Sequence, residues 1–348
     1  MSLAVLQERI RAAAERGTPL ELRGGGTKGF FGNAPRGDVL DTRGHAGITD
    51  YESSELVLTA RCGTPLAEVE QALAEKQQCL AFEPPHFGAA ATFGGCIAAG
   101  LSGPRRVAAG ALRDFVLGVR KIDGRARVLD FGGRVMKNVA GYDISRLVAG
   151  SLGTLGLIAE ASIKVLPAPR AERTLRLEMD EARALEALNR WAGEPLPISA
   201  SAWHAGVLHV RLSGSEPALA AGAARIGGDS LADAPAWWRA LREQTHGFFA
   251  GDEGLWRLSL PSTTPPLALG PQLIEWHGGL RWLRSGAGSD VRAAAQRAGG
   301  HATLFRARDR SAGAFAPLDP VLLRLHQALK EAFDPAGIFN PGRLYPEL

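Results

Sequence analysis

A run of glycines near the amino terminus has the composition of a phosphate-binding loop. The run, 24–28, comprises Gly24, Gly25, Gly26, Thr27 and Lys28. It follows residues 19–23, whose alternation is typical of a strand. Consecutive glycines let the backbone approach a ligand and turn several N–H groups toward one point, and such arrays bind phosphate. We expect Gly25 to need both this close approach and a positive φ. Taken alone, the residues fit a plain glycine turn equally well, and they match neither the Walker A nor the Rossmann pattern.

A second glycine-rich segment lies in an uncharged stretch, 84–104, that holds three prolines and five glycines. Its length would suit a membrane span, but its prolines and glycines would leave backbone groups unsatisfied in lipid. We therefore predict a buried, glycine-rich ligand loop, with close helix–sheet packing as the alternative. The candidate ligand-lining residues are Thr92, Gly94, Gly95 and Gly100.

A third segment begins at Lys137–Asp143 (KNVAGYD) and continues to a tight turn before a strand. The turn has glycines three residues apart. Its alternative, purely structural interpretation is a β-turn with a helix C-cap. Its candidate site residues are Gly150, Gly153 and Ile158.

The order and spacing of the three segments resemble the FAD-binding domain of the vanillyl-alcohol-oxidase family, also called the p-cresol methylhydroxylase (PCMH) type. The run GSLGTLGLIAEASIKVLP and the tail AFDPAGIFNPGRLYP are similar to two family motifs. Within that family, EPPHFGAAATFGG, RDFVLG and VMKNVAGYDISRL resemble the FAD-binding E subunits of bacterial three-subunit glycolate oxidases.

The resemblance implies a role for each segment. The loop 24–28 would hold the FAD pyrophosphate, the second segment would line the ribityl chain and isoalloxazine, and the third would contact the adenine half or support the second. Thr27 stands where covalent relatives carry histidine, so FAD would be bound non-covalently.

The implied function is an oxidoreductase subunit in glyoxylate metabolism, in a complex that converts glycolate to glyoxylate. Its partners would be a larger flavoprotein D subunit, which performs the chemistry, and an iron–sulfur subunit. Two alternatives remain open: a self-sufficient FAD-dependent 2-hydroxy-acid oxidase, and a non-enzymatic assembly subunit with a vestigial flavin site.

The sequence also departs from the family. The HxGDGN-like and GEHGIG-like motifs of relatives that oxidise D-2-hydroxy acids are absent, and Gly299–Thr303 is only an echo of them. Cys96 replaces an asparagine and Arg343 replaces a lysine. The catalytic residues therefore stay unknown, and no metal site is predicted.

Several other side chains could do chemistry but favour structural roles. Arg105 and Arg106 could bind a carboxylate or phosphate, although internal pairing is the preferred interpretation. His86 and His301 have a smaller chance of touching flavin or substrate. Three arginines beside tryptophans are expected to stack on them: Arg257, Arg281 and Arg284.

These segments need elements to position them. Helical periodicity predicts a first helix over 3–16 and a second over 64–77 that is N-capped by Thr64. Alternation and turn signals predict strands over 38–41, 55–62, 115–122, 127–131 and 157–166. A short helix is expected over 143–149, and a longer one over 318–333 ends at Asp334-Pro335.

Composition divides the chain. The glycine motifs end near Pro169, and all seven tryptophans lie in the following region. We predict an α+β fold with a two-part PCMH-type FAD-binding domain, 1–168, an α+β cap or interface domain, 169–316, and a C-terminal segment, 317–348, that returns to the FAD domain.

Composition also limits the function classes. The chain has 348 residues, 45% hydrophobic residues and a net charge of +4, without basic runs of the kind that bind nucleic acid. Three cysteines without a CxxC pair exclude a disulfide framework or a thiolate metal site. Charges in the first residues argue against a signal peptide. We expect a cytoplasmic protein without a transmembrane segment, which could reach the inner face of the membrane through its complex.

Overall fold

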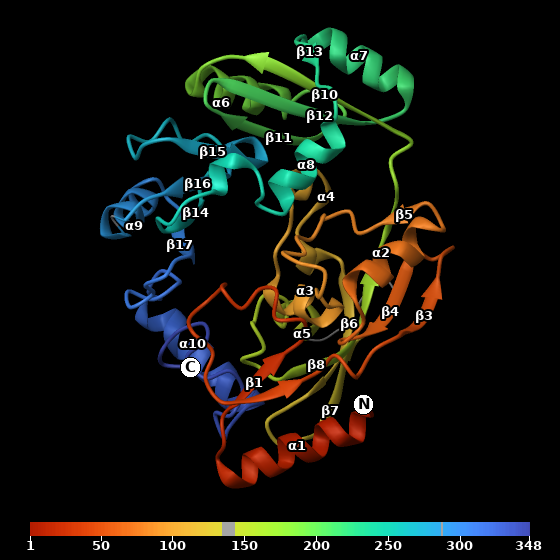
Figure 1. The fold of residues 1–348 in the computed structure, drawn as a ribbon, viewed down its shortest axis with the longest axis vertical. Helices are drawn as coiled ribbons and strands as arrows, with labels where there is room; N and C mark the ends of the chain where they lie inside the picture. Colours follow the sequence, from red (N-terminus) through yellow and green to blue (C-terminus); the bar gives the residue numbers. More distant parts are fainter. Residues whose placement is uncertain (134–142, 287) are drawn as a thin grey trace.

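A computed structural model describes residues 1–133, 143–286 and 288–348. The chain forms two parts, each built around its own antiparallel sheet (Figure 1). The predicted α+β class is confirmed. Residues 137–142 of the third predicted segment lie outside the described residues.

The lower part in Figure 1 contains a five-stranded sheet in the order β3-β4-β8-β6-β7. Its strands are β3 (Ile48–Glu52), β4 (Val57–Arg61), β6 (Val116–Ile122), β7 (Val128–Gly132) and β8 (Leu157–Lys164). The central strand β8 and its neighbour β4 are buried along most of their length, and their apolar residues share a core with α2 and α3.

Two small sheets adjoin it. The first pairs β1 (Leu20–Arg23) in parallel with β2 (Asp38–Asp41), and Leu20 also bridges to Phe339 of the tail. The second pairs β5 (Gln78–Cys79) with β9 (Leu166–Pro167).

The first helix, α1 (Leu3–Arg16), spans the predicted residues. Ser2 caps its start, Gly17 ends it with a φ of 63°, and the stripe Leu6, Ile10 and Ala13 is buried. The other short helices of this part are α2 (Leu66–Ala74), α3 (Phe93–Ala99), α4 (Arg106–Ala109), η1 (Leu112–Asp114) and α5 (Ile144–Leu147).

Two local predictions were wrong. The second helix is shorter than predicted, because α2 begins after Pro65, while Thr64 donates its hydroxyl to the carbonyl of Arg61 and caps nothing. The stretch predicted to be a loop contains α3, which Thr92 caps and Gly100 ends at a φ of 64°. Small residues allow this helix to pack closely against the sheet. The alternative of close helix–sheet packing therefore holds for part of the segment 84–104.

The upper part is an eight-stranded antiparallel sheet in the order β13-β10-β12-β11-β15-β16-β14-β17 (Figure 1). Its strands are β10 (Ala171–Glu178), β11 (Ile198–His204), β12 (Val207–Gly214), β13 (Asp229–Ser230), β14 (Leu255–Ser259), β15 (Gln272–Glu275), β16 (Leu280–Arg284) and β17 (His301–Arg306). Helical elements join them: α6 (Glu181–Trp191), α7 (Glu216–Ile226), α8 (Ala234–Arg242), η2 (Gly247–Phe249), η3 (Trp276–Gly278) and α9 (Gly288–Arg297).

A shared apolar core joins the two parts. Phe31, Leu101 and Leu152 from the lower part pack in one cluster with Trp282 and Phe305 from the inner face of the upper sheet. The last helix, α10 (Pro320–Phe333), lies beside the lower part and brings the carboxyl terminus back to β1 (Figure 1). The exact domain boundaries stay a prediction.

Candidate functional site

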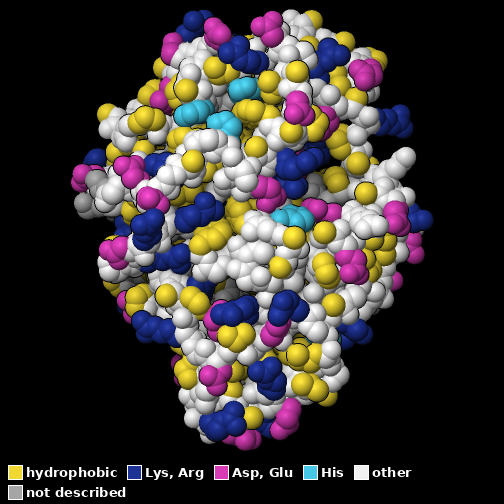
Figure 2. Space-filling model, in the orientation of Figure 1, with side chains coloured by type: hydrophobic (Ala, Val, Ile, Leu, Met, Phe, Trp, Pro, Cys, Tyr) yellow, Lys and Arg dark blue, Asp and Glu magenta, His cyan; other side chains and the backbone are white. Residues whose placement is uncertain are grey.

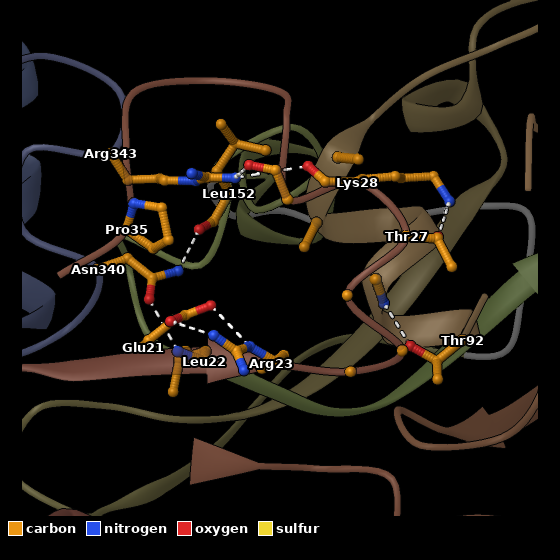
Figure 3. A pocket seen from close by; sticks show the side chains of 17 residues that line it. Glu21, Leu22, Arg23, Thr27, Lys28, Pro35, Thr92, Leu152, Asn340 and Arg343 are labelled. Carbon is orange, nitrogen blue, oxygen red and sulfur yellow. Dashed lines mark hydrogen bonds and ion pairs between the residues drawn. The ribbon is translucent and has the colours of Figure 1, made fainter. Parts of the chain in front are cut away.

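The first and second glycine segments meet in a cleft at the end of β1 (Figure 3). The cleft encloses about 620 Å³, including the solvent space at its mouth. All five predicted residues of the first loop line it, together with Thr92 and Gly95 of the second segment. The structure thus brings together residues separated by more than sixty positions in the chain.

The first loop presents unpaired backbone donors. Among the described residues, no hydrogen bond is donated by the N–H groups of Gly25, Gly26, Thr27 or Lys28, although Gly29 donates to Gly26 and Phe31 to Lys28. Consecutive free amides in such a loop form a concave site for an anion. This is the physical property expected of a pyrophosphate-binding loop.

Close approach explains two of these glycines. A Cβ at Gly24 would lie 2.2 Å from Thr92 Oγ1, and a Cβ at Gly25 would lie 1.5 Å from the carbonyl oxygen of Ala90. The expected positive φ occurs at Gly26, at 71°, and not at Gly25. Gly25 is therefore required by space, because the two segments touch there, and Gly26 by conformation.

Thr92 holds the second segment at the cleft. Its side chain is buried, and its Oγ1 accepts a hydrogen bond of 3.3 Å from the N–H of Gly95 (Figure 3). Gly94 packs against Cys62, where a Cβ would lie 2.5 Å from Cys62 Cβ. Gly94 therefore sets the distance between α3 and the sheet.

A narrower extension continues the cleft toward the third segment. Gly153 and Ile158 line this extension, as do Gly94, Gly95 and Cys62. Two predicted residues do not line either space: Gly100 and Gly150 pack on each other, and a Cβ at Gly100 would lie 2.8 Å from Gly150 Cα. They fix the second segment against the third.

Two tail residues that the sequence analysis did not place at the site complete the cleft. Asn340 Oδ1 accepts a 2.8 Å hydrogen bond from the N–H of Leu22, and its Nδ2 donates to the carbonyl of Leu152 (Figure 3). Arg343 donates to the carbonyls of Gly29 and Asn33. The sequence NPGR after the last helix could have pointed to these two residues, but the fold is needed to show that this segment lies next to β1.

The cleft is basic. Arg23 is paired with Glu21 at 2.6 Å. Within the part of the chain that the structure describes, Lys28 Nζ donates only to the carbonyl of His86, at 3.2 Å, and to Thr27 Oγ1, at 3.5 Å. Burial lowers the pKa of Lys28, and burial together with the charge of Arg310 lowers the pKa of Arg343 to about 10. Arg343 stays charged at neutral pH, which suits an anionic ligand.

The remaining candidates have identifiable surroundings. Arg105 pairs with Glu172 at 2.8 Å, and its neighbour Arg106 stacks on Trp276. His86 Nε2 lies 3.1 Å from Glu70 Oε2, and His301 lies on the edge strand β17. Within residues 1–133, 143–286 and 288–348, no cluster of three or more His, Cys, Asp or Glu side chains could hold a metal ion.

Of the three arginines expected to stack on tryptophans, two bind backbone carbonyls and one stacks. Arg281 is buried and donates to the carbonyls of Thr264 and Pro265, and Arg284 donates to the carbonyl of Phe249 at 3.0 Å. Arg257 stacks on Trp276, as expected for an arginine beside a tryptophan.

Comparison with known proteins identifies the group that this cleft fits. Residues 2–132 match a family model described as an FAD binding domain, and residues 288–344 match the C-terminal domain of FAD linked oxidases. The chain is 49% identical over 345 residues to the glycolate oxidase subunit GlcE of Escherichia coli, covering 99% of this chain and 97% of that protein. The chain belongs to the FAD-linked oxidases, in the group of GlcE. FAD is the cofactor of this fold, and the free amides and basic side chains of the cleft suit its pyrophosphate.

Two further relatives each match somewhat less than half of this chain. The Bacillus subtilis glycolate oxidase subunit GlcD is 32% identical over 170 residues, 48% of this chain and 36% of that protein. A D-lactate dehydrogenase of Archaeoglobus fulgidus is 35% identical over 164 residues, 46% of this chain and 36% of that protein. A solved alkyldihydroxyacetonephosphate synthase has the same fold, with a TM-score of 0.67 at 15% identity over 97% of this chain and 75% of that one.

The helices of this fold are short. In the part of the chain that the structure describes, none is both long and apolar enough to cross a membrane.

Proposed function

We propose that this chain is the FAD-holding subunit of a complex that oxidises glycolate to glyoxylate, as a structural or electron-relaying partner of a larger catalytic flavoprotein. The observation that carries the proposal is the intact flavin cleft in a chain that matches GlcE over almost its whole length. When bound, FAD supplies the redox chemistry, and the protein supplies binding and orientation.

The proposal assigns the FAD contacts by segment. The loop 24–28 holds the pyrophosphate through its free amides, and Thr92, Gly94 and Gly95 support the ribityl and isoalloxazine part. Gly153 and Ile158 line the adenine end, while Gly100 and Gly150 keep the second and third segments together. Binding is non-covalent, because Thr27 offers no imidazole for attachment.

The proposal also names the partners. GlcD and GlcE are both called glycolate oxidase subunits, and both match this chain, which supports a complex of two related flavoproteins. The larger D subunit performs the chemistry, and an iron–sulfur subunit accepts the electrons. The cytoplasm, at the inner face of the membrane if the complex docks there, is the proposed compartment. Three free cysteines suit a reducing environment.

One observation favours a second function, that of an oxidase in its own right. The upper sheet carries Arg257, which makes no ion pair with any described residue and lies near the buried carboxyl of Glu275. A cation and an acid–base group are what a hydroxy-acid site needs. The vestigial-site alternative is disfavoured, because the amides of the first loop donate no hydrogen bond to any described residue and so stay available to a ligand.

Stopped-flow reduction distinguishes these functions. We expect neither glycolate nor D-lactate to bleach the flavin absorption of the FAD-loaded chain rapidly, because the general-base motifs of the catalytic relatives are absent, and such catalysis contributes about 10²- to 10⁴-fold. Activity should appear when the D and iron–sulfur subunits are added. Rapid bleaching of the isolated chain by either acid would show that it is an oxidase itself.

A further inference from the structure

The last helix, α10, presents apolar side chains to solvent. Val321 and Leu325 are the most exposed large apolar side chains among the described residues, at 57% and 56%, and Leu322 is 44% exposed. Ala328 and Ala332 are exposed as well. The helix lies at the edge of the lower part in Figure 1, and hydrophobic side chains reach the surface there in Figure 2. Apolar surface gathered on one element is typical of an interaction site.

Four of these residues form one stripe. Val321, Leu325, Ala328 and Ala332 follow each other at intervals of four, three and four residues, which places them on one side of an α-helix. An amphipathic helix normally turns such a stripe toward the core of its own domain. In α10 the stripe faces outward, so its residues need another partner to leave water.

Other residues attach α10 to the lower part. Lys330 Nζ donates to the carbonyl of Thr154 at 2.9 Å. The ring of Phe333 lies 3.5 Å from Lys121 Nζ and edge-on to the ring of Phe131. The helix is therefore held on its body without the apolar stripe, which stays available to a second molecule.

The stripe is complementary in size to itself. Its large residues stand in the first half of α10 and its alanines in the second half. If a second α10 lies antiparallel against the first, with a two-fold axis at the middle of the stripe, Val321 faces Ala332 of the second copy and Leu325 faces Ala328. Large residues opposite small ones allow the two helices to interdigitate. A parallel pair would instead set valine against valine and alanine against alanine.

The two flanks of the stripe favour the same orientation. Arg324 and Glu331 are exposed on one flank, and neither makes a hydrogen bond or ion pair with any described residue. The antiparallel pair brings Arg324 close to Glu331 of the second copy, and the two-fold axis forms this ion pair twice. On the other flank, Leu322 comes close to Leu329 of the second copy. Charge and size are thus both complementary.

We propose that α10 is a docking surface for a second copy of this chain, paired through an antiparallel contact between the two helices. Both copies use the same surface, as a two-fold interface requires. A helix of 14 residues is about 21 Å long, so the contact is small. We expect a weak dimer, with a dissociation constant on the order of 10 µM. The contact uses no residue that lines the FAD cleft and is independent of the proposed function.

Sedimentation velocity of the full FAD-loaded chain, over about 1 to 200 µM, tests the proposal. The wild type should change from monomer to dimer within this range. Leu325→Glu should raise the dissociation constant by about 100-fold or more, because it buries a charge among apolar side chains. Val5→Glu is the matched control, because Val5 is a 47% exposed valine on another helix, α1. This variant should dimerise as the wild type does, and melting curves confirm that both variants are folded.

Charge reversal tests the orientation of the two helices. Arg324→Glu and Glu331→Arg should each raise the dissociation constant by about 10-fold, because each places like charges together twice in the dimer. The double variant restores both ion pairs and should recover the wild-type dissociation constant. A double variant as weak as the single variants would contradict the antiparallel pair.

The other possible occupants of α10 give different results. A wild type that stays monomeric up to about 200 µM, or a dimer that persists in Leu325→Glu, would overturn the proposal. In a monomeric wild type, binding to the D subunit that Leu325→Glu abolishes would assign the surface to that subunit. Binding to vesicles of phosphatidylglycerol and phosphatidylethanolamine, lost in the same variant, would assign it to a lipid surface.

Discussion

Arg343 acts on the flavin cleft through backbone carbonyls. Its guanidinium donates to the carbonyl oxygens of Gly29, at 3.1 Å, and Asn33, and Lys28 O lies at 3.5 Å. Because the guanidinium binds these carbonyl oxygens on one side of the loop, the backbone N–H groups stay free to bind an anion. The family lysine could supply the charge but not a planar fork.

We therefore expect Arg343→Met to weaken FAD binding by about 10-fold or more, since it removes charge-assisted hydrogen bonds. Arg343→Lys should recover only part of the loss. The control is Arg36→Met, at an exposed arginine of the connection between β1 and β2. Fluorescence titration with FAD measures all three, and equal affinity of the methionine variant and wild type would refute a role for the fork.

We propose that Thr27 leaves the flavin without a covalent bond. Among the described residues, its hydroxyl makes a hydrogen bond only with Lys28 Nζ, at 3.5 Å, and a threonine cannot form a histidyl–flavin bond. Acid precipitation of the loaded protein should release all flavin into the supernatant. A coloured pellet after washing would reveal a covalent link at another residue.

Glu275 should give the protein a measurable pH dependence. Burial raises its pKa from 4.5 to about 7 in the folded state, so folding binds a proton in this range. The free energy of unfolding should then fall as pH rises from about 4.5 to about 7, with a slope of up to about 1.4 kcal/mol per pH unit from this one group.

Glu275→Gln should remove that component, and the exposed Glu15→Gln should not. Urea unfolding at pH 5 and pH 8 gives the free energy of unfolding of the wild type and of both variants on either side of the expected titration of Glu275. If the free energy of unfolding of Glu275→Gln changes between these two pH values as much as that of the wild type, Glu275 does not titrate as described.

At the scale of elements, the tail closes the site. Lys330 of α10 donates to Asp334, at 2.6 Å, and to the carbonyls of Phe339 and Thr154, at 2.7 and 2.9 Å. Asp334 in turn accepts from the N–H groups that follow the helix. This buried cluster joins the tail to the turn of the third glycine segment.

Lys330→Met should destabilise the protein by about 3–5 kcal/mol, because it leaves the buried carboxylate of Asp334 without its cation. Lys76→Met, at an exposed lysine after α2, should change the free energy of unfolding by no more than about 0.5 kcal/mol. Denaturant unfolding provides the comparison. A cost at position 330 as small as at position 76 would show that the cluster does not hold the tail.

The elements also show how far the sequence could be interpreted. Strong periodicity predicted α1 to the residue, and alternation predicted β2. The helix α3 was missed because most of its residues, FGGCIAA, are small and none is polar, so the sequence shows no amphipathic stripe. Tertiary packing stabilises this helix. Asn340 and Arg343 could not be placed, because their partners in β1 and in the connection that follows it are more than three hundred residues away in the chain.

At the scale of the whole molecule, the two parts are joined by an apolar core and by specific polar contacts. Glu243 accepts from the backbone N–H of Phe87 at 2.8 Å, and Arg310 donates to the carbonyl of Gly32 at 2.7 Å. Both contacts lie close to the first or second glycine segment. The upper sheet therefore supports the loops that form the cleft.

The central claim is that the loop 24–28 holds FAD, and one substitution tests it directly. A side chain at Gly25 would collide with the carbonyl of Ala90, whereas Gly247 faces open space. The measurement is the FAD content of Gly25→Val and Gly247→Val after saturation with FAD and gel filtration, with melting curves to confirm folding. The account predicts wild-type FAD in the Gly247 variant and almost none in the Gly25 variant. A folded Gly25 variant with wild-type FAD content would contradict it.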